Sequence, residues 1–208
     1  ALAAAEGSEK HTDHTEWTAL TEDVLKEKEY QLEDGQYYFS GTEYEYGELV
    51  IETSSVLTVT GNVTLCLNNV SYTYTGNNES AVVVEENASL TICCCQPGQY
   101  SDYAGSIHAP NAKYVINNGG TLRITGGEVY SNVEYGAPVY NAGACTVSGG
   151  NLYGNAGNPL GGYKTAYGIY NADEASLTIT GAPTIEGKAP GEMDDPTGPQ
   201  IDVLTYDT

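Results

Sequence analysis

Leu122-Arg-Ile-Thr-Gly-Gly-Glu-Val-Tyr-Ser-Asn132 is the stretch that decides the fold, because its pattern recurs along the chain. Its first four residues alternate apolar with polar side chains, two glycines interrupt them, and the alternation then resumes. Alternation with a period of two predicts a short strand that buries one face, and a glycine pair predicts a turn. The stretch therefore predicts two strands joined by a tight corner.

The first strand of this stretch has copies elsewhere. Their first positions, 57, 90, 122, 145 and 177, are 33, 32, 23 and 32 residues apart, which is the spacing of one solenoid turn per repeat. In each copy we expect the first and third residues to point inward and the threonines outward. The copies are Leu57-Thr-Val-Thr-Gly61, Leu90-Thr-Ile-Cys93, Leu122-Arg-Ile-Thr-Gly-Gly127, Cys145-Thr-Val-Ser-Gly-Gly150 and Leu177-Thr-Ile-Thr-Gly181.

Two further elements accompany each repeat. One follows the glycines, at 128–132, 151–155 and, in degenerate form, 181–187. The other precedes the last four copies, as Val82-Val-Val84, Tyr114-Val-Ile116, Pro138-Val-Tyr140 and Gly168-Ile-Tyr170. Three strands and three turns per repeat predict an all-β fold, a single-stranded parallel β-helix or β-solenoid.

Asparagine recurs after the second element, and its side chain can bond its neighbour from coil to coil or support a turn. The predicted positions are Asn117, Asn141 and Asn171.

The two ends differ from the repeats. Residues 1–31 are interpreted as an N-terminal tail and a short capping helix, 32–187 as the β-helix coils, and 188–208 as a C-terminal loop with a last strand at 201–205. Within 15–31, Trp17, Leu20, Val24 and Leu25 would share one side of an amphipathic helix. An open solenoid end exposes its core, so a cap is expected there.

The phrases Gly-Asn-Val-Thr-Leu-Cys-Leu-Asn-Asn at 61–69, Ala-Ser-Leu-Thr-Ile-Cys at 88–93 and the Gly-Gly-x-Val/Leu-Tyr-x-Asn units carry a resemblance. They resemble the β-helix repeats of large surface proteins from gut Firmicutes, within the pectin-lyase-like superfamily, over about residues 32 to 187. The resemblance implies a right-handed parallel β-helix in a secreted or wall-attached bacterial protein with neighbouring domains. It leaves the ligand open, because this superfamily includes lyases, hydrolases, adhesins and passive stalks. Cys94 stands where these relatives often have Asp, and the chain is shorter than enzymes of this fold.

The charge excludes several partners. With 28 acidic and 7 basic residues the formal net charge is −21, which repels nucleic-acid phosphates and anionic membrane surfaces. No apolar stretch approaches the roughly 18 residues of a membrane span, so membrane insertion is not expected. Ca²⁺ is the cation that such a chain would attract, but no acidic loop has the calcium-hand spacing, and no cofactor is predicted.

The five cysteines form an odd set. Three consecutive cysteines lack the two-residue gap with which a Cys-x-x-Cys pair grips one Zn²⁺, and alternation places Cys94 on the opposite face from its neighbours. Small core residues with one disulfide are therefore preferred to a metal site. The candidates for a disulfide or for the core are Cys66, Cys93, Cys95 and Cys145.

The sequence gives little support to a catalytic function. A polysaccharide lyase needs a cationic base, and Arg123, the single arginine, has no Asp on matching strands. A glycoside hydrolase needs two carboxyl groups across the scissile bond, and Glu128 and Glu186 lie two coils apart. No histidine is fixed near a cysteine by the repeat, and His11-Thr-Asp-His14, although it offers three metal ligands, is interpreted as a solvated terminus.

Tyrosines at the solenoid edges favour binding, because an aromatic ring beside Asn or Asp is how proteins hold sugars. The chain is thus predicted to be a secreted or cell-surface module for adhesion or architecture that contacts glycans or host surface proteins, not an enzyme. A polysaccharide-acting enzyme is the alternative; a flat Thr-x-Thr face for ice binding is a third, interrupted at Arg123 and Cys93. The candidate ligand-binding residues are Tyr130, Tyr135, Tyr153, Tyr163 and Tyr167.

Overall fold

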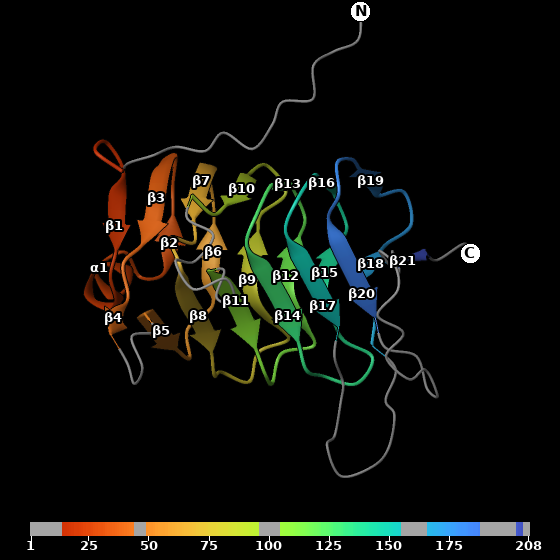
Figure 1. Cartoon of the computed structure of the whole chain (residues 1–208), viewed down its shortest axis with the longest axis horizontal. Helices are drawn as coiled ribbons and strands as arrows, with labels where there is room; N and C mark the ends of the chain where they lie inside the picture. The colour runs from red at the N-terminus through yellow and green to blue at the C-terminus, as the bar shows by residue number, and fades with distance from the viewer. Residues whose placement is uncertain (1–13, 44–48, 96–104, 155–165, 188–202, 206–208) are drawn as a thin grey trace, which may run out of the picture.

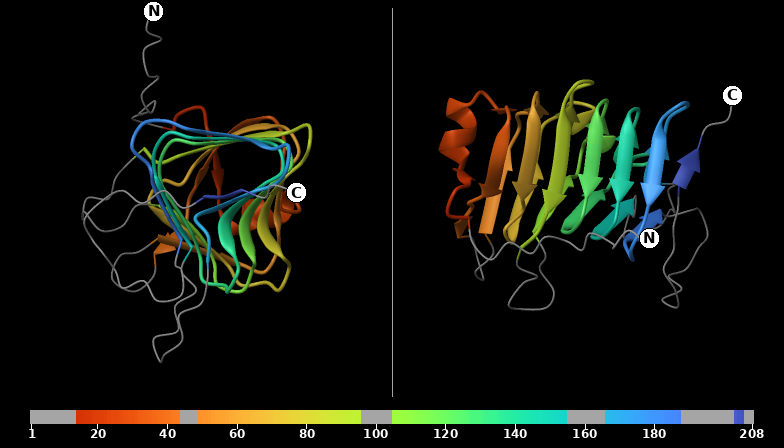
Figure 2. Two further views of the ribbon diagram at one scale, coloured as in Figure 1. Left: turned by 90° about the vertical axis from the view of Figure 1, so that its right-hand side faces the viewer. Right: turned by 90° about the horizontal axis from the view of Figure 1, so that it is seen from above.

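The computed structural model describes residues 14–43, 49–95, 105–154, 166–187 and 203–205, and within them the chain is a parallel β-helix. Figure 1 shows the coils stacked side by side from the N-terminal to the C-terminal end. The axial view in Figure 2 shows three sheets as the sides of a roughly triangular tube. From β7 onward the chain visits the three sheets in a constant order, so each coil contributes one strand to each sheet.

In the described residues each sheet contains seven strands, and every strand pair is parallel except β4 with β5. Sheet A, in spatial order, consists of β1 (Thr18–Leu20), β3 (Gly35–Phe39), β7 (Asn62–Cys66), β10 (Ser89–Cys93), β13 (Thr121–Ile124), β16 (Ala144–Val147) and β19 (Ser176–Ile179). Sheet B consists of β2 (Gln31–Leu32), β6 (Leu57–Val59), β9 (Ser80–Val84), β12 (Tyr114–Asn118), β15 (Ala137–Asn141), β18 (Ile169–Asn171) and β21 (Val203–Thr205). Sheet C consists of β20 (Thr184–Gly187), β17 (Asn151–Gly154), β14 (Glu128–Ser131), β11 (Ser106–Ala109), β8 (Val70–Tyr74), β5 (Leu49–Thr53) and β4 (Thr42–Glu43).

The core is a set of inward rows that run along the tube. Leu90, Leu122 and Cys145 are aligned across three neighbouring strands of sheet A, and all three are buried. The residues between the inward positions face outward, as the alternation predicts. Burial of these apolar rows supplies the main stabilisation of the tube.

One copy of the repeat belongs to another sheet than predicted. Leu57 is aligned with Val82 in sheet B, whereas the residue aligned with Leu90 in sheet A is Val63. The first repeat of sheet A is therefore Asn62–Cys66, and the step from position 63 to position 90 is 27 residues instead of 33. Both strands alternate apolar residues with threonine, and this alternation shows which face is buried without showing to which sheet the strand belongs.

A ladder of buried amides runs along the inside of sheet B. Asn118 Nδ2 donates to Asn141 Oδ1 at 2.7 Å, and Asn141 Nδ2 donates to Asn171 Oδ1 at 2.7 Å. Asn141 Nδ2 also donates to the carbonyl oxygen of Ser176 at 3.0 Å. The prediction of Asn117 at this position is wrong by one residue: Asn117 is aligned with Tyr140 on the outward face, since neighbouring strand residues point in opposite directions.

Replacing Asn141 by Ala should lower the free energy of unfolding by about 2 kcal/mol, because it leaves buried amide and carbonyl groups of the adjoining coils without partners. Chemical denaturation followed by circular dichroism measures this. Asn117→Ala is the matched control and should change stability by less than about 0.5 kcal/mol. Equal losses in the two variants would contradict a stabilising ladder.

The N-terminal end is capped by a helix that is shorter than predicted. Helix α1 spans Glu22–Glu27, with the Thr21 side chain accepting a hydrogen bond from the Val24 N–H at 3.2 Å. Residues 18–20, predicted to be helical, instead pair with β3 as strand β1. In the first coil α1 occupies the place of a sheet C strand, and Figure 2 shows this helix at the N-terminal end of the stack. Its Leu25 side chain is buried. No helix in the described ranges has the length and apolar character that crossing a membrane requires.

Candidate functional site

An aromatic strip lies on the outward face of sheet C. It consists of His108, Tyr130 and Tyr153, which are aligned on the neighbouring strands β11, β14 and β17. The rings of His108 and Tyr130 stack with centroids 4.0 Å apart and planes 14° apart. Parallel pairing in register thus places one ring per coil in a single row.

Amide and carboxylate groups border the aromatic strip. Asn132 Nδ2 lies 3.2 Å from His108 Nε2. Asn151 Nδ2 donates to Glu128 Oε1 at 3.1 Å, in the row next to the strip. In the following coil Glu186 is aligned with Tyr153. Rings beside amides and carboxylates provide both the apolar contact and the hydrogen-bonding groups that sugar hydroxyls require.

The strip is uncharged at neutral pH. Burial lowers the pKa of His108 to about 4, so its imidazole is neutral above that pH. Burial also raises the pKa of the Tyr153 hydroxyl, and the charges of Glu128 and Glu186 raise it further. The result is a neutral aromatic surface with an acidic border.

The depressed pKa of His108 predicts a stability loss in acid. Between pH about 6.5 and about 4 the unfolded chain binds a proton at this imidazole and the folded chain does not, so stability falls as the pH falls through this range. The measurement is the free energy of unfolding against pH for the wild type and for His108→Gln. The variant should show a shallower decline, since the carboxylates and the other histidines titrate in both proteins. Identical pH profiles would contradict the prediction.

The structure places the predicted tyrosines in three settings. Tyr130 and Tyr153 are neighbours in the aromatic strip. Tyr135 is 57% exposed in the turn after β14, and the Tyr167 N–H donates to the Gly136 carbonyl oxygen at 2.9 Å, so these two occupy the same corner on successive coils. Tyr163 lies outside the described residues. The sequence reasoning missed His108, because nothing in its local sequence aligns it with Tyr130.

A second group of tyrosines lies on sheet B. Tyr140 has its ring centroid 4.8 Å from that of Tyr114 and 5.3 Å from that of Tyr170. Lys113 Nζ lies 4.9 Å from the centroid of the Tyr114 ring. These rings pack on one another and on a lysine. A substitution in this group therefore serves as a control for a substitution in the aromatic strip.

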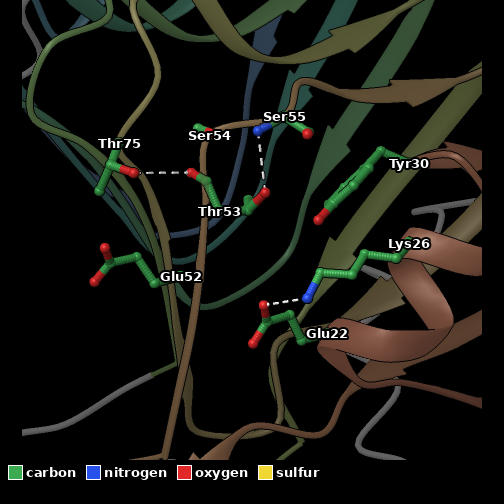
Figure 3. A pocket seen from close by; sticks show the side chains of 8 residues that line it. All are labelled: Glu22, Lys26, Tyr30, Glu52, Thr53, Ser54, Ser55 and Thr75. Carbon is green, nitrogen blue, oxygen red and sulfur yellow. Dashed lines mark hydrogen bonds and ion pairs between the residues drawn. The ribbon is translucent and has the colours of Figure 1, made fainter.

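A polar groove of about 490 Å³ lies between helix α1 and the end of β5 (Figure 3). On one side Lys26 Nζ pairs with Glu22 Oε1 at 2.6 Å, and both side chains are more than half exposed. On the other side Thr75 Oγ1 donates to the Thr53 carbonyl oxygen at 3.3 Å. An exposed ion pair one helical turn apart is weak, and it gives this groove no specific chemistry.

A cluster of two thiols and an imidazole lies on the outward face of sheet A. It consists of His14, Cys66 and Cys95, whose ligand atoms all lie within 4.8 Å of one another. Cys66 Sγ is 3.4 Å from Cys95 Sγ, and Cys95 Sγ is 3.6 Å from His14 Nε2. The sequence indicated that the repeat itself places no histidine near the cysteines, and the histidine found here comes from outside the repeat. His14 precedes the repeat, and only the path of the chain along sheet A places it there.

The packing around the thiol–imidazole cluster holds its members in place. The His14 ring stacks on Tyr38 with centroids 4.2 Å apart, and Tyr38 is aligned with Cys66 on the neighbouring strand. A hydrogen bond with Cys93 and burial raise the pKa of the Cys66 thiol. Burial raises that of Cys95 to about 12.

The other cysteines have different surroundings. Cys145 points into the core, where burial raises its thiol pKa to about 12. Cys94 Sγ lies 3.8 Å from Asn69 Oδ1 and is not a member of the thiol–imidazole cluster. Cys93 Sγ lies 3.7 Å from the Leu65 carbonyl oxygen, and Cys93 is also hydrogen-bonded to Cys66. None of the five cysteines, all of which lie in the described residues, forms a disulfide.

Comparison with known proteins gives no match: no family model, no curated protein and no solved structure is significantly similar to this chain.

Proposed function

We propose that this chain is a β-helix module of a secreted or surface-attached bacterial protein and that it binds glycans on the aromatic strip of sheet C. The observation that carries the proposal is the alignment of His108, Tyr130 and Tyr153 on three successive coils. A row that repeats once per coil presents the same kind of group at each strand spacing, about 4.8 Å. Such a surface suits a polymer with repeating units.

The groups that border the strip favour one class of glycan. A neutral imidazole and two tyrosines offer apolar contact, and Asn132 and the Asn151–Glu128 pair offer hydrogen bonds. Glu186 and the net charge of −21 repel anionic chains. The ligand we propose is therefore a neutral or amino-sugar glycan, and uronate-rich polymers are disfavoured.

The remainder of the tube has an architectural role in this proposal. Its strands are hydrogen-bonded from coil to coil over most of its length, which makes a stiff rod. An acidic surface keeps such a rod soluble. As a rod in a surface protein, the chain would hold the aromatic strip away from the cell wall, in the role of an adhesin or a spacer.

The test is binding to a glycan array, followed by calorimetry with each glycan that is retained. Tyr153→Ala should weaken binding by about tenfold or more, since it removes a ring from the strip. Tyr140→Ala, which removes a ring on sheet B, is the control and should leave the affinity unchanged.

Three outcomes would contradict the proposal. They are the absence of binding to any neutral or amino-sugar glycan, equal losses in the two variants, and release of sugar from a polysaccharide panel in amounts that Glu128→Gln abolishes. The last outcome would identify the chain as a glycoside hydrolase.

A further inference from the structure

The thiol–imidazole cluster joins three segments that are far apart in the sequence. His14 precedes the first strand, Cys66 ends β7, and Cys95 follows β10. Cys66 occupies an outward position on its strand, aligned with Tyr38 and Cys93, and is nevertheless fully buried. Three side chains with soft or borderline donor atoms thus converge outside the core.

The distances match those between the ligands of one small cation. Zn²⁺ binds thiolate sulfur at about 2.3 Å and imidazole nitrogen at about 2.0–2.1 Å, so a tetrahedral ion holds two sulfurs about 3.8 Å apart and a sulfur and a nitrogen about 3.5 Å apart. The observed Cys66–Cys95 separation is 3.4 Å and the Cys95–His14 separation is 3.6 Å. Small side-chain movements would bring the three donors to these values.

A disulfide between Cys66 and Cys95 explains less of the observed arrangement than a metal site does. Joining Cys66 and Cys95 would require the sulfurs to approach to about 2.05 Å. It would also leave the imidazole beside Cys95 without a chemical role. The His14 ring, however, is fixed by stacking on Tyr38 and by an edge contact with Trp17, whose ring centroid lies 5.4 Å from that of His14. This arrangement orients His14 Nε2 toward Cys95 Sγ.

We propose that His14, Cys66 and Cys95 form a binding site for a d¹⁰ transition-metal cation of the Zn²⁺ class. Sulfur and imidazole donors select such ions over Ca²⁺ and Mg²⁺, which prefer oxygen. In the structure the Cys95 thiol donates to Asn68 Oδ1 at 3.8 Å, a hydrogen bond that is given up when the thiol loses its proton to bind a cation. His14 and Cys95 are partly exposed, so solvent can supply a fourth ligand.

The site would stabilise the N-terminal end of the β-helix. A cation bound by these residues ties the segment before β1 to the coils that contain β7 and β10. Binding that requires the folded arrangement raises the unfolding temperature, because it stabilises the fold by an amount that grows with the logarithm of ligand concentration over Kd. This site is independent of the glycan proposal, because it lies on sheet A whereas the aromatic strip lies on sheet C.

The experiment uses the full chain, reduced with a phosphine that does not compete as a thiol ligand. Native mass spectrometry with added Zn²⁺ should show one ion per chain, and Co²⁺ should give thiolate-to-metal charge-transfer absorption. Cys95→Ser should weaken Zn²⁺ binding by more than about 100-fold, because it removes a direct ligand. His14→Phe keeps a ring to stack on Tyr38 and removes the ligand nitrogen; it should lose the Zn²⁺-dependent rise in melting temperature.

Cys94→Ser is the matched control, since Cys94 adjoins Cys95 in sequence but its sulfur lies near Asn69. It should bind Zn²⁺ as the wild type does. Circular dichroism confirms that each variant is folded. The proposal is overturned if the reduced wild type binds no Zn²⁺, if Cys94→Ser loses as much affinity as Cys95→Ser, or if His14→Phe keeps the full thermal shift.

Discussion

Hydrogen bonding of each coil to the previous one, parallel and in register, is the constraint on which the rest of this structure depends. It aligns residues of equal position in rows along the tube, both inside and outside. The inward rows contain the apolar core and the Asn118–Asn141–Asn171 ladder. The outward rows contain the aromatic strip and the row of Tyr38, Cys66 and Cys93. The aromatic strip is therefore a consequence of register, whereas the thiol–imidazole cluster combines Cys66, which register places, with His14 and Cys95 from outside the strands.

The corners between the sheets must be tight for the coils to stack at this spacing. A Cβ atom at Gly143 would lie 2.1 Å from the Gly120 carbonyl oxygen of the preceding coil, which no side chain tolerates. Gly127 and Gly150 occupy equivalent corners, with φ of 84° and 83°, a region that L-residues rarely adopt. The recurring glycines of the sequence thus lie where the backbones of neighbouring coils are in close contact.

The two outward surfaces differ in chemistry although both arise from the same stacking. On sheet C the rows present rings and amides that neither ionise nor react at neutral pH, which is suitable for a binding surface. On sheet A the row that contains Tyr38, Cys66 and Cys93 is covered by a segment from outside the repeat, and thiols and an imidazole meet there. The repeat itself produces the aromatic strip on sheet C. The thiol–imidazole cluster on sheet A forms where a segment from outside the repeat covers the strands.

The alternation in the sequence was sufficient to predict the β-helix, its inward residues and the three strands of each coil, because a period of two is a local property that does not depend on distant contacts. It was insufficient to assign Leu57 to sheet B or to choose Asn118 over Asn117. Those choices depend on how many residues each corner uses, and corners of different length leave the same alternation intact.

The tyrosine rows were partly visible as repeat positions, but His108 and His14 were not. Their neighbours are set by the stacking of coils and by the path of the chain before the first strand, which only the tertiary structure decides.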